Sequence, residues 1–181
     1  LHEQGLLSLR PGLEPGEAAG DMLRAVDWSK TKAYALGLGG IYLNLSGREG
    51  QGIVGPDEAE QLKATIANGL TALRDPADGV SAVRGVSTRE DVYQGPFAPE
   101  APDLIVRFAA GYRVSWESSM GGVAEGLFAD NIKKWSGDHI IDPTLVPGVL
   151  FMNRPFREEN ADLKDLAPTI LEALGVPKGS S

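Results

Sequence analysis

The spacing of hydrophobic residues predicts one long helix in the first half of the chain. Apolar side chains recur there at steps of three and four residues, at Leu62, Ile66, Leu70 and Leu73. This period places them on one side of an α-helix. Pro56 suits the first helical turn, and Asp75-Pro76 stops the pattern. We therefore predict a helix over residues 56–74 whose apolar stripe packs on a sheet or on another helix.

Short apolar runs bounded by turn residues predict several strands. They cover residues 32–36, 41–45, 80–86 and 103–108, with a shorter candidate at residues 6–9. The first two runs lie on either side of Gly37-Leu-Gly-Gly40, and residues 41–45 alternate between apolar and polar positions, as in a half-buried strand. Residues 88–93 suggest a short helix. Strands and helices thus interleave along the chain.

Residues 111–117 allow two interpretations. Tyr112, Arg113 and Trp116 combine aromatic and polar groups beside a glycine pair, which suits the lining of a substrate cleft. The alternative is an ordinary strand with Val114 and Trp116 on one face, and this alternative is favoured. Arg113 nevertheless remains the best internal candidate for contact with a substrate phosphate.

The last third of the chain predicts one more strand and one more helix. Residues 146–152 form an apolar run short enough to be a buried strand. A helix is expected to begin near Asp165 and to end at Gly175 and Pro177. Its buried face would consist of Leu166, Ile170, Leu171 and Leu174. The fold class predicted from these elements is α/β, with a sheet covered by helices.

Composition and charge narrow the classes of function. With 42% hydrophobic and 23% charged residues, a chain of 181 residues can bury one sizeable core. The formal net charge of −8 disfavours non-specific binding of nucleic acid. A phosphate substrate would need a metal ion to offset the repulsion by this negative charge. No apolar run approaches the length of a membrane span, so we expect no membrane segment. The absence of cysteine excludes disulfides and thiolate metal sites; a cytoplasmic location is favoured, but the compartment stays open.

The candidate chemistry centres on His139, one of only two histidines. It lies in a loop rich in Gly, Asp and Pro, immediately before the apolar run at residues 146–152. A neutral imidazole is a common zinc ligand, and carboxylates such as Asp138 or Asp142 are its usual companions. The competing interpretation is a surface or hydrogen-bonded histidine without a metal.

The segment around His139 resembles part of a known superfamily. His139 followed by Asp142-Pro143 and Val146-Pro147, and then by an apolar run, is similar to the late metal-binding histidine segment of the alkaline phosphatase superfamily. Residues 165–177 resemble the closing helix of its sulfatase, phosphodiesterase and phosphomutase branches. The nearest branch is the type I phosphodiesterase/nucleotide pyrophosphatase group, or the predicted phosphohydrolases and phosphomutases related to it, which carry segments like residues 33–45 and 47–53.

The resemblance implies a fold, and it implies which part of the catalytic domain this chain would form. Residues 1–181 would be a single domain or the C-terminal portion of a larger catalytic domain with an alkaline phosphatase-like fold. Two divalent ions, usually zinc, would activate a Thr or Ser nucleophile, and His139 matches the last histidine of the metal-binding set. The nucleophile and the other ligands are expected in the upstream part of the same chain, so residues 1–181 alone would be inactive.

A second alignment with the superfamily ranks below the first. Asp138-His139 would then be the superfamily's Asp-His-Gly pair, with both residues binding metal, but Ile140 replaces the expected glycine. The function implied by the resemblance is metal-dependent hydrolysis of phosphodiester or pyrophosphate bonds in a small-molecule phosphate ester. The alternatives are a sulfatase or phosphomutase of the same superfamily, or a structural or binding domain without catalysis.

Two further motifs carry little weight. The glycines at residues 37–40 and 47–52 do not form the G-x-G-x-x-G pattern that opens a dinucleotide-binding helix, and neither is followed by the Lys-Ser/Thr of a P-loop. Asn44-Leu-Ser46 matches the triplet for N-glycosylation, and we interpret this match as chance.

Overall fold

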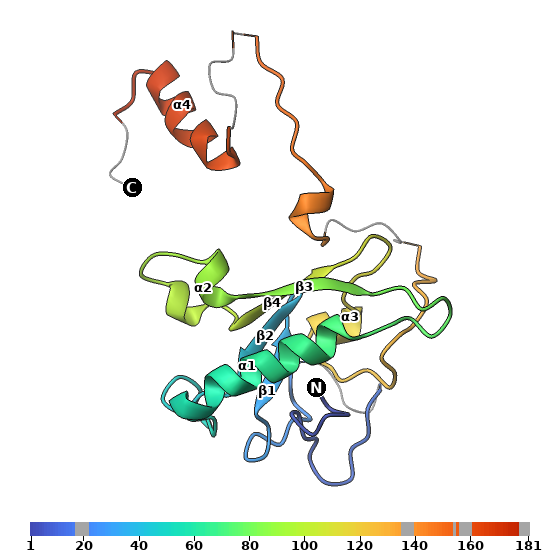
Figure 1. Ribbon diagram of the computed structural model, residues 1–181. Helices are drawn as coiled ribbons and strands as arrows, with labels where there is room; N and C mark the ends of the chain where they lie inside the picture. Colours follow the sequence, from blue (N-terminus) through green and yellow to red (C-terminus); the bar gives the residue numbers. More distant parts are fainter. Residues whose placement is uncertain (17–21, 135–139, 154, 156–160, 178–181) are drawn as a thin grey trace. The chain divides into compact units, whose positions relative to one another are not determined.

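The structure is a computed structural model that describes residues 1–16, 22–134, 140–153, 155 and 161–177. The chain divides into two compact units, Leu1–Pro147 and Gly148–Ser181. Four α-helices and one four-stranded antiparallel sheet are present among these described residues, so the protein has a mixed α/β structure (Figure 1).

The larger unit is built on the sheet. Its strands are β1 (Ala33–Leu36), β2 (Gly40–Leu43), β3 (Val83–Thr88) and β4 (Leu104–Phe108). Their spatial order is β1-β2-β4-β3, and every neighbouring pair is antiparallel. The strands predicted at residues 32–36, 41–45 and 103–108 are confirmed. The predicted strand at residues 80–86 begins three residues later, because the backbone at Ser81 pairs instead with Arg74 at the end of the connection from the long helix.

Helix α1 (Pro56–Thr71) covers one face of the sheet (Figure 1). The predicted helix is confirmed, with its C-terminal cap at Ala72. Leu62 and Ile66 are buried, and they belong to a core cluster that also contains Ala33, Ile41, Leu43, Val54, Val83, Leu104 and Val106. Burial of a leucine side chain stabilises a fold by about 1.5–3 kcal/mol. This cluster therefore holds helix and sheet together and fixes the strands that carry the polar groups described below.

Short helices connect the strands. Helix α2 (Arg89–Val92) confirms the short helix predicted at residues 88–93. Its first turn is a capping box in which Thr88 and Asp91 satisfy each other's backbone N–H groups. The 3-10 helix η2 (Ala98–Glu100) lies in the proline-rich connection to β4. At residues 6–9 the predicted strand is reduced to a single bridge between Leu9 and Val26.

Residues 111–117 do not form the favoured strand. Helix α3 (Trp116–Ser119) begins inside this stretch, and Ser115 caps it by accepting a hydrogen bond from the Ser118 N–H at 3.0 Å. The prediction of a strand with Val114 and Trp116 on one face was therefore wrong. A serine one position before the helix offers the backbone a cap, and this local hydrogen bond outweighs the alternating pattern.

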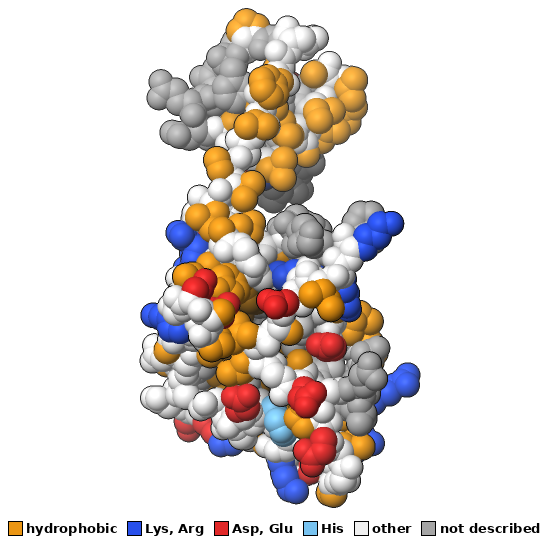
Figure 2. Space-filling view, turned by 90° about the vertical axis from the view of Figure 1, so that its right-hand side faces the viewer, with side chains coloured by type: hydrophobic (Ala, Val, Ile, Leu, Met, Phe, Trp, Pro, Cys, Tyr) orange, Lys and Arg blue, Asp and Glu red, His pale blue; other side chains and the backbone are white. Residues whose placement is uncertain are grey.

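The smaller unit contains one α-helix. Helix α4 (Leu166–Ala173) follows the 3-10 helix η4 (Leu163–Asp165) and confirms the predicted closing helix. None of its residues is buried, although a buried face was predicted. The strand predicted at residues 146–152 is absent, and Val149 and Phe151 are 83% and 91% exposed, so this prediction was wrong. Figure 2 shows hydrophobic side chains on the surface of this unit.

Among the described residues, no helix is both long and apolar enough to cross a membrane.

Candidate functional site

The predicted metal ligands and their loop are only partly described. His139 and Asp138 lie outside the described residues. Asp142 is described, and it begins the 3-10 helix η3 (Pro143–Leu145) as its N-cap. The description of the site therefore starts from Asp142, three residues after His139 in the sequence.

Asp142 is a buried carboxylate with partners on both oxygens. Its Oδ1 accepts hydrogen bonds from the Thr144 N–H at 3.0 Å and the Thr144 hydroxyl at 2.8 Å. Its Oδ2 accepts from Arg84 Nε at 3.1 Å and from Arg107 Nη1 at 3.4 Å. The Asp142 backbone N–H donates to the Phe108 carbonyl at 3.2 Å. The loop that follows His139 is thus tied to strands β3 and β4, and this carboxylate has no vacant oxygen to offer a metal.

The two arginines reach Asp142 because of an irregularity in the sheet. The register between β3 and β4 shifts at Val83/Gly85, so Arg84 lies at a bulge, and its side chain is exposed. Arg107 pairs with Gly85 across the two strands. A side chain at Gly85 would collide with the Arg107 guanidinium, so glycine makes room for it. The cluster of Arg84, Arg107 and Asp142 is called the Asp142 cluster below.

The environment of Asp142 predicts how it responds to pH. Hydrogen bonds from the backbone N–H and hydroxyl of Thr144 hold the pKa of Asp142 below its usual range, and Arg84 and Arg107 act in the same direction. Because the folded-state pKa is lowered, the ionised carboxylate stabilises the protein above the unfolded-state pKa of about 3.9, and this contribution is lost as the pH falls through the folded-state pKa.

We therefore expect the difference in unfolding free energy between the wild type and Asp142→Asn to be constant from pH 7 to pH 5 and to shrink below pH 4. Urea unfolding at a series of pH values measures it. A difference that is as large at pH 3 as at pH 7 would contradict a stabilising role for the charge, because a lowered folded-state pKa requires the contribution to shrink once the pH falls below the unfolded-state pKa.

Arg113 has its own local partners. Its guanidinium carbon lies 4.4 Å from the centroid of the Trp116 ring, and its Nε donates to the Val114 carbonyl at 3.1 Å. This is a cation–π contact at the start of α3, which holds the side chain against the indole. Arg113 is not among the groups that contact Asp142, and its predicted contact with a substrate phosphate stays a prediction.

A second buried carboxylate, Asp103, was missed by sequence reasoning. It is 3% exposed and accepts hydrogen bonds from the Leu43 N–H at 2.7 Å, from Arg48 Nη1 and Nη2 at 3.0 and 2.6 Å, and from Arg89 Nη1 at 3.1 Å. Both arginines are mostly covered, with 23% and 21% of their side chains exposed. Both carboxylate oxygens of Asp103 are bound by the two arginines and the Leu43 N–H, so we interpret Asp103 as a structural residue. An aspartate directly before an apolar strand was the available signal.

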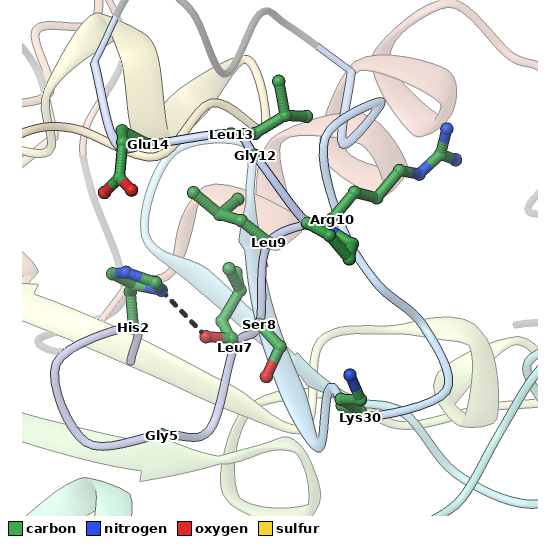
Figure 3. Close-up of a pocket in the computed structure, with 11 residues that line it drawn as sticks. His2, Gly5, Leu7, Ser8, Leu9, Arg10, Gly12, Leu13, Glu14 and Lys30 are labelled. Atoms are coloured by element: carbon green, nitrogen blue, oxygen red, sulfur yellow. Dashed lines mark hydrogen bonds between the residues drawn. The ribbon is translucent and has the colours of Figure 1, made fainter.

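A surface hollow of about 410 Å³ lies in the N-terminal segment, and its lining includes His2, Leu7, Arg10, Glu14 and Lys30 (Figure 3). His2 Nδ1 lies 3.0 Å from the Leu7 carbonyl, which satisfies that ring nitrogen. The Arg10 side chain extends away from His2 in the same view. Glu14 is the only carboxylate among the described residues that line the hollow, so these residues do not supply a set of metal ligands.

Within the described ranges, no three His, Cys, Asp or Glu side chains are close enough to hold a metal ion together. Comparisons with protein-family models, curated proteins and solved structures found no match for this chain. The Asp142 cluster is therefore the best-defined polar site adjoining the segment that the sequence singled out.

Proposed function

We propose that the protein is a metal-dependent hydrolase of phosphodiester or pyrophosphate bonds, with an alkaline phosphatase-like fold. The observation that carries the proposal is the Asp142 cluster. Asp142 belongs to the same short motif as His139, and both of its oxygens and its backbone N–H are bound by groups of the sheet and of η3. A metal-binding histidine needs such a supported loop, because a ligand must be held in one geometry to bind tightly.

His139 is proposed to supply one imidazole nitrogen, and the remaining ligands and the nucleophile are proposed for the upstream part of the same chain. Two divalent ions, zinc by the resemblance, would stabilise the attacking and leaving oxygens of an in-line displacement when bound. Asp142 does not fit the predicted role of a carboxylate companion, since its oxygens already accept from Thr144, Arg84 and Arg107. Its proposed role is to hold the His139 loop to the sheet.

The late histidine and the closing helix do not distinguish a phosphodiesterase from a sulfatase or a phosphomutase of the superfamily that this chain resembles. A sulfatase or a phosphomutase therefore stays an alternative, which substrate tests separate. A binding or structural domain without catalysis is the alternative from a different class, and it predicts no zinc-dependent turnover of any ester.

The experiment is hydrolysis of bis-p-nitrophenyl phosphate by the full-length protein with added zinc. We expect His139→Ala to lower the rate by about 100-fold, because a lost metal ligand costs at least as much as a lost second-shell partner. His2→Ala is the matched control, since His2 is the other histidine and lies in the N-terminal hollow; its rate should equal that of the wild type.

Circular dichroism and thermal unfolding establish that both variants are folded. An unchanged rate in folded His139→Ala would remove His139 from the site. Absence of turnover in the wild type, with turnover of sulfate esters instead, would replace the phosphodiesterase by the sulfatase.

A further inference from the structure

We infer that Arg84 and Arg107 form a binding site for a phosphate-type oxyanion, and that this site receives a second, non-reacting anionic group of the substrate. The substrate part of this inference rests on the proposed function, whereas the binding of an oxyanion does not. The two arginines come from neighbouring strands and meet at one carboxylate oxygen, Asp142 Oδ2.

The arginines retain donors that Asp142 does not use. Arg84 contacts the carboxylate only through Nε, at 3.1 Å, which leaves both of its terminal nitrogens without a hydrogen bond among the described residues. Arg107 contacts it through Nη1 alone, at the long distance of 3.4 Å. Its Nε also has no partner in the part of the chain that the structure describes, but this atom is buried and is not counted among the donors open to a ligand. A guanidinium presents five N–H donors, and a fork of two of them matches a phosphate or carboxylate edge.

Charge favours an anion at this point. Two guanidinium groups and one carboxylate leave a local excess of one positive charge, on a chain whose net charge is −8. Asp142 is 1% exposed, whereas the side chains of Arg84 and Arg107 are 46% and 37% exposed. The carboxylate thus orients the two arginines from beneath, and the cations themselves remain open to a ligand.

The Asp103 cluster shows why this arrangement differs from a structural ion pair. There, Arg48 donates twice to Asp103 and once more to the Leu43 carbonyl at 2.8 Å, and Glu49 neutralises it further. Arg89 is likewise shared with Glu90. At Asp142 no second carboxylate among the described residues pairs with either arginine. The unmatched donors and charge therefore distinguish the two clusters.

The size of the site indicates the class of ligand. Two adjacent guanidinium groups match one tetrahedral oxyanion, such as a terminal phosphate of a pyrophosphate or a phosphate monoester. A nucleic acid needs a longer run of cations, and the acidic chain opposes it. Inorganic pyrophosphate is therefore the probe of choice, with inorganic sulfate as a second tetrahedral oxyanion.

The test uses the full-length protein in zinc-free buffer containing EDTA, with ¹⁵N–¹H spectra of the arginine Nε groups during titration with pyrophosphate. We expect saturable shifts of the Arg84 and Arg107 resonances. Arg84→Gln and Arg107→Gln should each weaken binding by about tenfold, which is the effect of losing a charge-assisted pair. Arg10→Gln is the matched control, because it removes the same charge from the N-terminal hollow.

Arg84→Lys provides a second variant that keeps the charge but loses the fork. Binding intermediate between wild type and Arg84→Gln supports bidentate recognition. Sodium chloride at the same ionic strength as the pyrophosphate solution should not reproduce or abolish these shifts. If it does, or if Arg10→Gln weakens binding as much as Arg84→Gln, the arginines make only non-specific ion pairs and the proposed site is wrong.

A kinetic measurement separates this inference from the proposed function. If the protein hydrolyses phosphodiesters, Arg84→Gln should raise KM about tenfold more for a substrate with a second phosphate than for bis-p-nitrophenyl phosphate, which lacks that group. Pyrophosphate binding without any hydrolysis would refute the proposed function and keep the oxyanion site. Hydrolysis by the wild type, together with no effect of Arg84→Gln on KM or on pyrophosphate binding, would refute the oxyanion site and keep the proposed function.

Discussion

Replacement of Asp103 by asparagine is expected to lower the free energy of unfolding by about 3 kcal/mol. Asparagine keeps the shape and can still accept from the Leu43 N–H, so the loss reports mainly on the charge. Arg48 and Arg89 would be left with their positive charges next to a neutral group. Removal of one member of a buried ion pair costs about 3–5 kcal/mol. The lower value applies, because about a fifth of each arginine side chain remains in contact with water.

Urea unfolding followed by circular dichroism measures this loss at pH 7. Asp57→Asn is the matched control, since Asp57 is an exposed residue in the first turn of α1 and loses only a helix-dipole interaction of less than about 1 kcal/mol. Equal stabilities of the two variants would contradict the buried network. In that case Arg48 and Arg89 would have to be solvated in the folded protein independently of Asp103.

Replacement of Asn44 by alanine is expected to lower the free energy of unfolding by a similar amount, about 3 kcal/mol. Asn44 is fully buried, and its Nδ2 donates to the carbonyls of Trp28, Thr31 and Gln51 at 3.1, 2.8 and 3.0 Å. These carbonyls belong to two loops that flank the β1–β2 hairpin. Each buried acceptor that loses its donor costs about 1–3 kcal/mol, and partial relaxation of the loops reduces the sum.

Asn68→Ala is the control for this variant, because Asn68 is exposed on α1, where alanine has the higher helix propensity. Its stability should be unchanged or slightly increased. Thermal unfolding of both variants gives the comparison, and a loss below about 1 kcal/mol in Asn44→Ala would mean that the loops do not depend on this side chain. The burial of Asn44 also supports the interpretation of its glycosylation triplet as chance.

The two buried aspartates have different consequences for function. Asp103 is surrounded by groups that neutralise each other, and we expect its variants to change stability without a specific effect on ligand binding. Asp142 sits beneath two partly exposed arginines, and its loss should disturb both the loop that carries His139 and the proposed oxyanion site. Measurements of stability and of pyrophosphate binding on the same variants therefore separate a structural ion network from a binding one.

Local patterns determined most of the secondary structure. The apolar period of residues 56–74 is a property of the chain itself, and α1 ends only three residues before the predicted boundary. The glycine turn between β1 and β2 and the short helix predicted at residues 88–93 are likewise short-range features. Helix periods, turns and caps depend on residues a few positions apart, which is why a single sequence reveals them.

Tertiary structure alone decided which charges meet. Asp103 pairs with Arg48 across 55 positions, and Asp142 pairs with Arg84 across 58. No local pattern links such residues, because strand order and the bulge at Arg84 bring them together. The sequence likewise marked residues 148–152 as apolar but could not show them outside a strand, since burial requires a partner surface and pairing requires a neighbouring edge. Hydrophobicity is a property of a residue, whereas burial is a property of its surroundings.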